Sequence, residues 1–600
     1  MFNQINEKKI KKRTFFLLLI IILIQTAVIV YSFAFLKEDF HSDEQWSFGL
    51  SNSYYEPYIF QDADETGLSY TNQWVSPEIF HNYMTVQEDQ RFNYKSVFYN
   101  QSKDLHPPLF YSVLHTICSF FPDRLSYWYG FAINIPVFII TQIFLFASVR
   151  KITKSDVSAI AGCILYGFSV GALNTYVFIR MYAMCTMWCT ILAYLHIRMH
   201  KQEKIAGTLP LIFLTTLAGA LTHHFFLSFA GCLSACFCFY YLFRKKFRKM
   251  FAYAITQLSA AGMSVLIFPA TINHLFGRRG EIIKFSPSWQ IRISFNLVTS
   301  ELFGFHVSVF KSATLSIVLA VTVAVIILLL PLIYLFRNET WFKKLVSQLK
   351  VFIKKAFIKT KKSVKTADFS YIAVSLSGIF VIFTTAFLVS AITMNDTMDR
   401  YMFMVFPAMV IMTICILSNI INSINKSLSK KNLHSVIIVA ASVLLCINAN
   451  LNSEKKYLFC KNESSTVSIS ETIKNSNCIY ISREYWLMTC LADKFSNCNA
   501  VYPCDPSMIK ENLADLSKVP DNESPYYLIA NADIFKGDEN EDENEDNVII
   551  NSIPLFNKAD NLITQSEFEE YVKSLPTFSD IELTGTDTVF GRLFYIYKLS

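Results

Sequence analysis

Apolar runs of membrane length recur along this 600-residue chain, and they constrain its fold more than any other feature. Each run is about 17–25 residues long, which is enough for an α-helix to cross a bilayer. The composition agrees, because 52% of the residues are hydrophobic and only 17% are charged, whereas a soluble chain of this length carries more charge. The sequence therefore predicts a mainly α, polytopic transmembrane helical bundle.

The first run, residues 14–36, follows a basic segment and lacks a small-residue cleavage site, so it is interpreted as a retained helix and not as a signal peptide. Further spans are predicted at residues 127–149, 157–177, 181–198, 207–222, 224–243, 251–272, 312–336, 370–392, 401–422 and 434–450. Basic loops connect them at residues 150–155, 198–206, 244–250, 337–369 and 425–432. By the positive-inside rule these loops are cytoplasmic.

One short apolar segment, HPPLFYSVLHTICSFFP at residues 106–122, decides the number of crossings. Counting it as a span gives twelve crossings and turns the later basic loops outward. Treating it as a re-entrant or interfacial helix gives eleven crossings and keeps the strongly basic short loops inside, which the charge rule favours. The N-terminal residues 1–13 are then cytoplasmic, and the C-terminus lies outside.

The last 150 residues differ in composition from the rest of the chain. Residues 451–600 are polar, with short strand-like runs at 477–482, 525–530 and 593–599, which predicts a small exterior α/β domain. An acidic stretch at 537–547 is interpreted as a solvated loop. Disulfides are left open for the five cysteines of this region: Cys460, Cys478, Cys490, Cys498 and Cys504. The transmembrane module is expected to cover residues 14–450.

Ionisable and aromatic side chains gather at the predicted exterior ends of the spans, although polar groups at membrane depth are costly. The exterior loop 37–105 has twelve acidic and four basic residues. The candidate residues at this face are Asp43, Glu44, His106, Arg180, Tyr182, His223, His224, Arg278, Arg279, Arg400 and Tyr401. Each alone has an ordinary explanation, such as a solvated acid, an interfacial arginine anchor or a belt aromatic.

Together these residue types suit the transfer of a group from a phosphate to a hydroxyl. A carboxylate can accept the proton of the hydroxyl as a general base. An arginine presents a planar set of donors that matches phosphate oxygens. Preorganised arginine or histidine donors can stabilise the charge that grows on a leaving phosphate. No basic stripe is interleaved with stacking aromatics, so nucleic acid is not expected as a partner.

The ordered motifs resemble the GT-C membrane glycosyltransferases, and especially their protein O-mannosyltransferase, aminoarabinose transferase and lipopolysaccharide-core sugar transferase members. The resemblance covers about residues 10–410 and is carried by SDEQWS, HPPLFYSVLH, RMYAM, THHFF and DRYMFMVFP. It implies a hexosyl or pentosyl donor carried on a polyprenyl phosphate within the bilayer. Some members of this family use a divalent metal and others do not, and no second acidic motif here predicts one.

The resemblance also implies roles for the residues. Asp43 matches the acidic catalytic position of the first exterior loop, and Glu44 would position the acceptor or support Asp43. Arg400 and Tyr401 match a motif near the donor phosphate, which Arg278 or Arg279 would also contact. The same cavity would be lined by His106, Arg180, Tyr182, His223 and His224. One base and a direct displacement imply inversion at the anomeric carbon.

Three other classes stay open as alternatives: a transporter, a surface-glycan polymerase or ligase, and a scaffold without activity. A transporter is expected to carry ionisable residues at mid-membrane and repeated halves, and the sequence has no visible repeat. A polymerase usually has its large functional loop late in the chain, whereas here the loop follows the first span. The sequence identifies neither the sugar nor the acceptor, which could be a lipid, a glycan or a protein. The expected location is a bacterial plasma membrane, with the active site facing outward.

Overall fold

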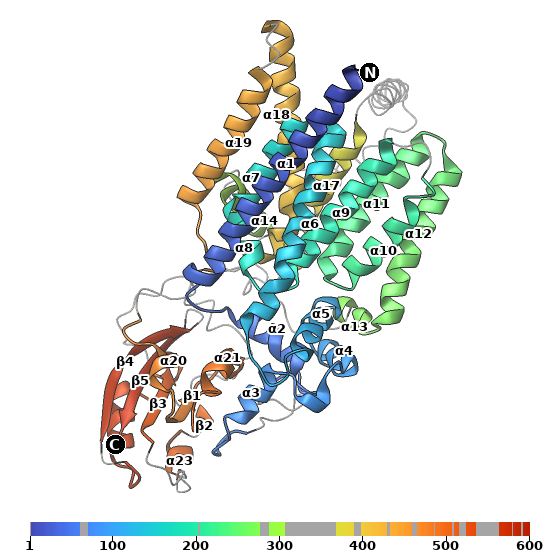
Figure 1. Ribbon diagram of the computed structural model, residues 1–600. Helices are drawn as coiled ribbons and strands as arrows, with labels where there is room; N and C mark the ends of the chain where they lie inside the picture. The colour runs from blue at the N-terminus through green and yellow to red at the C-terminus, as the bar shows by residue number, and fades with distance from the viewer. Residues whose placement is uncertain are drawn as a thin grey trace, which may run out of the picture. The chain divides into compact units, whose positions relative to one another are not determined.

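A computed structural model shows how these segments fold (Figure 1). The structure describes residues 2–59, 70–201, 205–276, 287–306, 368–388, 398–428, 433–458, 465–484, 486–506, 509–514, 516, 524–535, 563–578, 580–589 and 592–600. The chain forms two compact units. The first consists of residues 1–27, 136–175 and 182–454, and the second consists of residues 28–135, 176–181 and 455–600.

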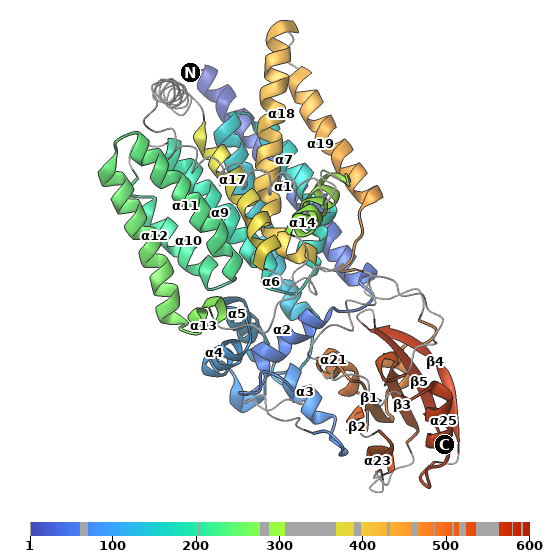
Figure 2. The same ribbon diagram turned by 180° about the vertical axis from the view of Figure 1, so that it is seen from behind.

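The first unit is a bundle of helices. Its elements are α1 (Phe2–Tyr31), α6 (Tyr127–Thr153), α7 (Asp156–Gly167), α8 (Val170–Val177), α9 (Tyr182–Lys201), α10 (Leu209–Ala220), α11 (His224–Phe243), α12 (Phe247–Ile267), α13 (Thr271–Phe276), α14 (Pro287–Phe303), α17 (Phe369–Leu388), the 3₁₀ segment η4 (Met398–Val405), α18 (Phe406–Leu428) and α19 (Leu433–Asn452). Three of its helices, α1, α6 and α8, extend into the second unit's ranges. Helices α10, α11 and α12 lie side by side (Figure 1). From behind, α14 is seen beside α17 and α19 (Figure 2).

Seven helices of the described residues are long and apolar enough to cross a membrane, or eight if the bent pair α7 and α8 is one span. This confirms the predicted multi-pass helical class. The pair is bent by 60°, so the run predicted at 157–177 is not one straight helix but a broken span or a re-entrant loop. Of the other predicted spans, α10 is too short and α9 is not apolar enough to pass the same test, and residues 312–336 lie outside the described residues.

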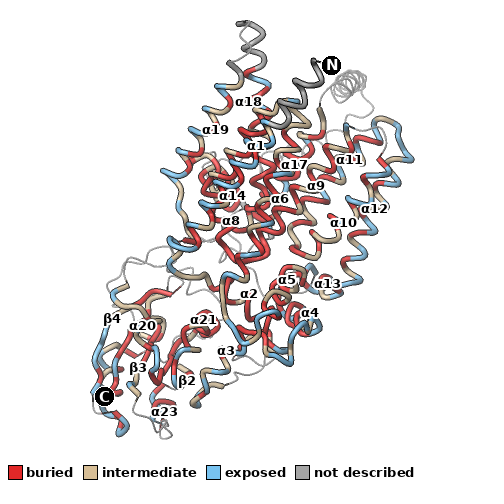
Figure 3. Tube along the Cα trace, in the orientation of Figure 1, coloured by how far each residue is buried: buried red, intermediate tan, exposed pale blue. Residues whose placement is uncertain are grey.

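The surface of the bundle is apolar where lipid is expected. Helix α12 exposes Phe251, Ile255, Leu258 and Leu266, the last two with 73% and 74% of their surface accessible. Helix α9, in contrast, is buried along nearly its whole length (Figure 3). Apolar side chains exposed over several turns of a helix are typical of a surface that contacts lipid.

The second unit contains the loop predicted at 37–105, which is largely helical. Its elements are η1 (Ser32–Leu36), α2 (Ser42–Asn52), α3 (Glu78–Met84), η2 (Glu88–Gln90) and α4 (Tyr94–Lys103), followed by α5 (Leu109–Ser119). Helix α5 has 11 residues and is about 16 Å long, because an α-helix rises about 1.5 Å per residue. It is too short to cross a bilayer, as expected for segment 106–122.

The C-terminal part of the second unit is the predicted α/β domain. Its elements are α20 (Ile469–Thr472), β1 (Asn477–Ile481), α21 (Trp486–Cys490), α22 (Ala492–Phe495), β2 (Ala500–Cys504), α23 (Ile509–Ala514), β3 (Tyr526–Asn531), η6 (Ala532–Ile534), α25 (Gln565–Lys573), β4 (Ile581–Val589) and β5 (Arg592–Leu599). The strands form one sheet in the order β2-β1-β3-β5-β4. Strand β1 pairs in parallel with β2 and β3, and β5 pairs antiparallel with β3 and β4.

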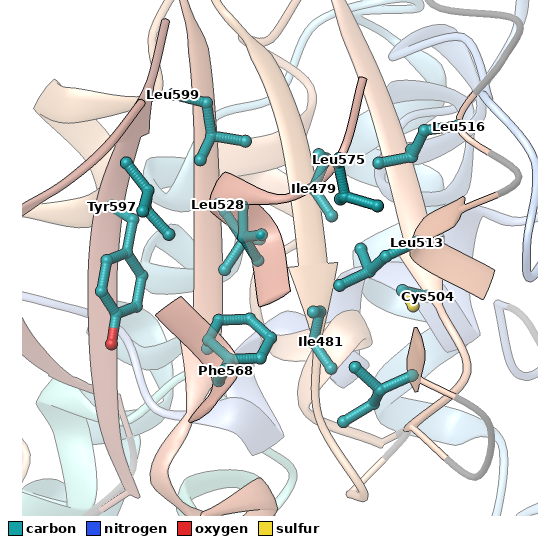
Figure 4. Packing of buried hydrophobic residues seen from close by; sticks show 14 of the residues in the cluster. Ile479, Ile481, Cys504, Leu513, Leu516, Leu528, Phe568, Leu575, Tyr597 and Leu599 are labelled. Atoms are coloured by element: carbon teal, nitrogen blue, oxygen red, sulfur yellow. The ribbon is translucent and has the colours of Figure 1, made fainter. Parts of the chain in front are cut away.

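An apolar core covers one face of this sheet (Figure 4). Ile479, Leu528 and Tyr597 project from three neighbouring strands toward Phe568 of α25 and Leu513 of α23. Alternate residues of a strand point to opposite faces, so Tyr480 points to the other face, where its ring contacts Phe495 of α22. Helices therefore cover both faces of the sheet.

Four of the five cysteines of this domain belong to the described residues. Cys478, Cys490, Cys498 and Cys504 are buried and form no disulfide, and Cys460 lies outside the described residues. The acidic stretch 537–547 lies outside them as well.

Asp533, in the 3₁₀ turn after β3, links the stability of this domain to pH. Burial and the nearby charge of Glu484 raise the pKa of Asp533 from 3.8 to about 7. In the unfolded chain the same group ionises near pH 4, so folding is penalised increasingly between about pH 4 and pH 7. We expect Asp533→Asn to raise the melting temperature of the detergent-purified full chain more at pH 8 than at pH 5. Equal shifts at both pH values would contradict this.

Candidate active site

The HSDE sequence at residues 41–44 forms the first turn of α2. His41 is the N-cap residue, and its Nδ1 accepts a hydrogen bond of 3.1 Å from the backbone N–H of Asp43. The Glu44 carboxylate accepts one of 2.7 Å from the backbone N–H of His41, which completes a capping box. Carboxylates are favoured in a first helical turn, where backbone N–H groups have no partner within the helix. Asp43 and Glu44 are therefore placed by local sequence.

Glu44 is fully buried, and three donors form four hydrogen bonds to its oxygens. Besides His41, they are the Lys37 ammonium, 3.0 Å from each carboxylate oxygen, and the backbone N–H of Ile179 at 2.9 Å. Burial raises the pKa of Glu44, and the charge of Lys37 opposes this rise without cancelling it. Glu44 thus connects α2 to Lys37, which follows the first helix, and to Ile179 in segment 176–181.

Lys37 is buried together with Glu44 and also binds a residue far away in the chain. Its ammonium donates a hydrogen bond of 2.9 Å to the carbonyl of Tyr457, and the N–H of Glu38 donates one of 2.9 Å to the carbonyl of Leu458. The sequence indicated Lys37 only as one of four basic residues in an acidic loop. Its position directly after an apolar run and seven residues before Glu44 is the signal that could have identified it.

Asp43 differs from its neighbour in keeping some accessibility. Its side chain is 11% exposed, and its Oδ1 lies 4.0 Å from a guanidinium nitrogen of Arg180. Arg180 is itself buried, donates hydrogen bonds to the Asp43 carbonyl and the Ser47 hydroxyl, and lies over the ring of Tyr111. The predicted residues Asp43 and Arg180, 137 positions apart in the chain, are thus brought together.

His106 belongs to the same unit and pairs with a residue that the sequence did not single out. Its Nδ1 lies 2.7 Å from Oδ2 of Asp104. Burial acts to raise the pKa of Asp104, but His106 and, more weakly, Arg180 outweigh it, and the pKa of Asp104 is lowered. Asp104 thus belongs to the same electrostatic network as Arg180. The sequence Asp104-Leu-His106 was the available signal, since a carboxylate two residues before a histidine can reach its ring.

A second set of predicted residues meets in the helical unit. Tyr182 begins α9, His223 is the N-cap residue of α11, and Tyr401 lies in η4. The Tyr182 ring centroid is 5.2 Å from that of His223 and 5.8 Å from that of Tyr401. The Arg400 guanidinium lies 5.3 Å from the centre of the Tyr401 ring. Three distant sequence motifs are therefore neighbours, as expected.

Two other predictions have different outcomes. His224 faces His274 of α13, with 3.3 Å between the Nε2 and Nδ1 atoms, and this histidine pair was not predicted. Arg278 and Arg279 lie outside the described residues. Within the described part of the chain, no group of three or more His, Cys, Asp or Glu side chains is arranged to hold a metal ion.

Comparison with known proteins gives similar structures but no similar sequences. No protein-family model matches the chain, and no curated protein matches it. The chain is similar to ArnT from Cupriavidus metallidurans bound to undecaprenyl phosphate, with 8% identity and a TM-score of 0.47 over 96% of this chain and 97% of ArnT. It is also similar to the oligosaccharyltransferase AglB from Archaeoglobus fulgidus in complex with an inhibitory peptide and a dolichol-phosphate, with 9% identity and a TM-score of 0.43 over 86% of this chain and 69% of AglB.

Proposed function

We propose that this protein is a membrane glycosyltransferase that moves a sugar from a polyprenyl-phosphate donor to an acceptor hydroxyl. The observation that carries the proposal is the contrast between two adjacent carboxylates. Glu44 is fully buried and bound by three donors, whereas the Asp43 side chain is 11% exposed next to a buried arginine. A general base needs a carboxylate that a substrate can reach and a surrounding structure that fixes its position. Asp43 fits the first requirement, and the buried Glu44 beside it fits the second.

In the proposed reaction, Asp43 accepts the proton of the acceptor hydroxyl while that oxygen attacks the anomeric carbon. The bond from this carbon to the phosphate oxygen breaks, and the phosphate leaves on the polyprenyl chain with one additional negative charge. A single direct displacement inverts the anomeric configuration. Glu44 and Arg180 position Asp43, and both are buried. Glu44 accepts a hydrogen bond from the N–H of His41, the N-cap residue of α2, and Arg180 donates one to the carbonyl of Asp43.

We assign the leaving phosphate to Arg400 and Tyr401, and on sequence alone to Arg278 and Arg279. The assignment of Arg400 is supported by its burial, since it is 7% exposed, and by its placement over the Tyr401 ring, which limits its orientations. Contact with the sugar or the acceptor is assigned to the remaining residues of the candidate set: His106, Tyr182, His223 and His224. The site is proposed to face outward from a bacterial plasma membrane.

The donor assignment predicts that Arg400→Gln binds a polyprenyl phosphate at least about tenfold more weakly than the wild type, because hydrogen bonds to charged groups contribute about 1.5–3 kcal/mol. Binding is measured by native mass spectrometry of the detergent-purified full chain. Arg248→Gln, at an exposed position in α12, is the matched control and should bind normally. Equal binding by the wild type and Arg400→Gln would contradict the assignment.

A transporter of lipid-linked sugars would also bind this lipid, so a transfer assay accompanies the binding measurement. Membranes that contain the protein are incubated with lipid-linked sugars extracted from the same cells. We expect polyprenyl phosphate to be released and the sugar to be recovered on an acceptor. Binding without release would support transport instead.

A further inference from the structure

Residues of the C-terminal domain contact the start of the candidate catalytic helix. Five side chains form what we call the support cluster: Asp39, Gln45, Tyr127, Asp493 and Lys494. The Tyr127 hydroxyl lies 2.7 Å from Oε1 of Gln45, in the first turns of α2, and 3.1 Å from Oδ2 of Asp493, in α22. One hydroxyl thus bridges the candidate catalytic helix and the C-terminal domain.

The protons of this bridge can be assigned. A tyrosine hydroxyl has one proton, so it cannot donate to both oxygens. The Gln45 amide nitrogen is buried and has no hydrogen-bond partner in this arrangement. Turning the amide over lets its N–H donate to Tyr127, whose own proton then goes to the Asp493 carboxylate. In this order the Tyr127 hydroxyl accepts from the Gln45 amide and donates to a carboxylate, which is a strong acceptor.

A second connection within the same unit runs beside the first. The Lys494 ammonium lies 3.3 Å from Asp39, three positions before the first residue of α2. Burial acts to lower the pKa of Lys494, but Asp493 and Asp39 outweigh it, so the pKa is raised and the side chain stays charged. Helix α21 also contacts α2. The C-terminal domain therefore holds the segment on both sides of Asp43.

We propose that the C-terminal domain positions Asp43, with Tyr127, Asp493 and Lys494 as positioning residues that act through α2. The expected effect on turnover rests on the proposed function, whereas the expected effect on hydrogen exchange of α2 does not. Without the bridge, α2 keeps its own capping box but loses the connection that fixes Gln45, two residues after Asp43. A small displacement of a catalytic group lowers turnover steeply.

The test is Tyr127→Phe in the full-length protein. The variant keeps the ring that stacks on Phe40 and removes only the hydroxyl. We expect faster amide hydrogen exchange over residues 42–52 and a fall in kcat of about tenfold, with the KM for the lipid-linked sugar unchanged. Tyr129→Phe is the matched control, because Tyr129 is two residues away and its ring stacks on Phe121. It should behave like the wild type in both measurements.

A companion pair of variants separates positioning from a general loss of structure. Asp493→Asn keeps an oxygen that can accept from Tyr127, so it should retain most of the turnover. Asp493→Ala removes the acceptor and should match Tyr127→Phe. The double variant Tyr127→Phe with Asp493→Ala should be no worse than either single variant, because both changes break one bridge. Losses that multiply in the double variant would overturn the proposal.

The remaining outcomes are also decisive. Unchanged exchange over α2 in Tyr127→Phe overturns the proposal, and so does faster exchange without a fall in kcat. If Asp43→Asn keeps full turnover, the proposed role of Asp43 fails. Hydrogen exchange over α2 alone then decides whether the support cluster holds the helix.

Discussion

Lys37→Met is expected to destabilise the protein by about 3–5 kcal/mol, because removing one partner of a buried ion pair leaves the other charge uncompensated. The side chains of Lys37 and Glu44 are 1% and 0% exposed, so water cannot replace the missing ammonium. Methionine preserves most of the volume, so the loss is mainly electrostatic. The change in the free energy of unfolding is measured by denaturation of the purified full chain in mixed detergent micelles.

A second substitution distinguishes charge from packing. Glu44→Gln removes the charge but keeps an oxygen for the backbone N–H groups of His41 and Ile179. The double variant Lys37→Met with Glu44→Gln should therefore recover part of the stability that the single variant loses. If Lys37→Met lowers the free energy of unfolding by less than about 1 kcal/mol, the ion pair contributes no more than a solvent-exposed salt bridge does.

Asp43→Asn is expected to lower the turnover of lipid-linked sugar by a factor of about 10² to 10⁴, the usual contribution of a general base. The amide has nearly the same shape as the carboxylate but cannot take the proton of an acceptor hydroxyl at neutral pH. Folding should be little affected, since the capping box of α2 uses His41 and Glu44 and not the Asp43 side chain. Turnover is measured as the release of polyprenyl phosphate.

Asp89→Asn is the matched control for this experiment. Asp89 belongs to η2, in the same loop of the chain, and is exposed. Its substitution should leave turnover unchanged. If Asp43→Asn and Asp89→Asn have the same turnover as the wild type, another residue accepts the proton.

Much of the fold could be predicted because it depends on local patterns. The runs at 477–482, 525–530 and 593–599 correspond to β1, β3 and β5. Strand β2 was not predicted, since it contains Pro503, which cannot donate to a neighbouring strand. Strand β4 was not predicted because its middle, residues 584–587, has no apolar side chain and includes Gly585.

In the helical unit, two features were not predicted: the bend between α7 and α8, and helix α14. The run at 157–177 is mostly apolar, and the signal for the bend between α7 and α8 was the pair Gly167 and Ser169, which stand at the break. Helix α14 lies in a segment that was predicted as part of a loop, and it packs against α17 and α19. Packing of this kind overrides weak local preference.

For the site, the sequence indicated candidate residues but not what each one contacts. Asp43 and Glu44 look equivalent in the sequence, and only the backbone N–H of Ile179 and the ammonium of Lys37 make one of them inaccessible. The carbonyl that completes the Lys37 site belongs to Tyr457, 420 residues away in the chain. Partners this distant cannot be found from periodicity or spacing.

The most direct test is mass spectrometry of the envelope glycans of cells that lack the protein and are rescued with either the wild type or Asp43→Asn at matched membrane levels. We predict that the wild type restores a sugar that the deletion strain lacks and that Asp43→Asn does not. The mass difference then gives the class of sugar. Equal restoration by both would contradict the role of Asp43, and no glycan difference between the deletion strain and the wild type would contradict the transferase itself.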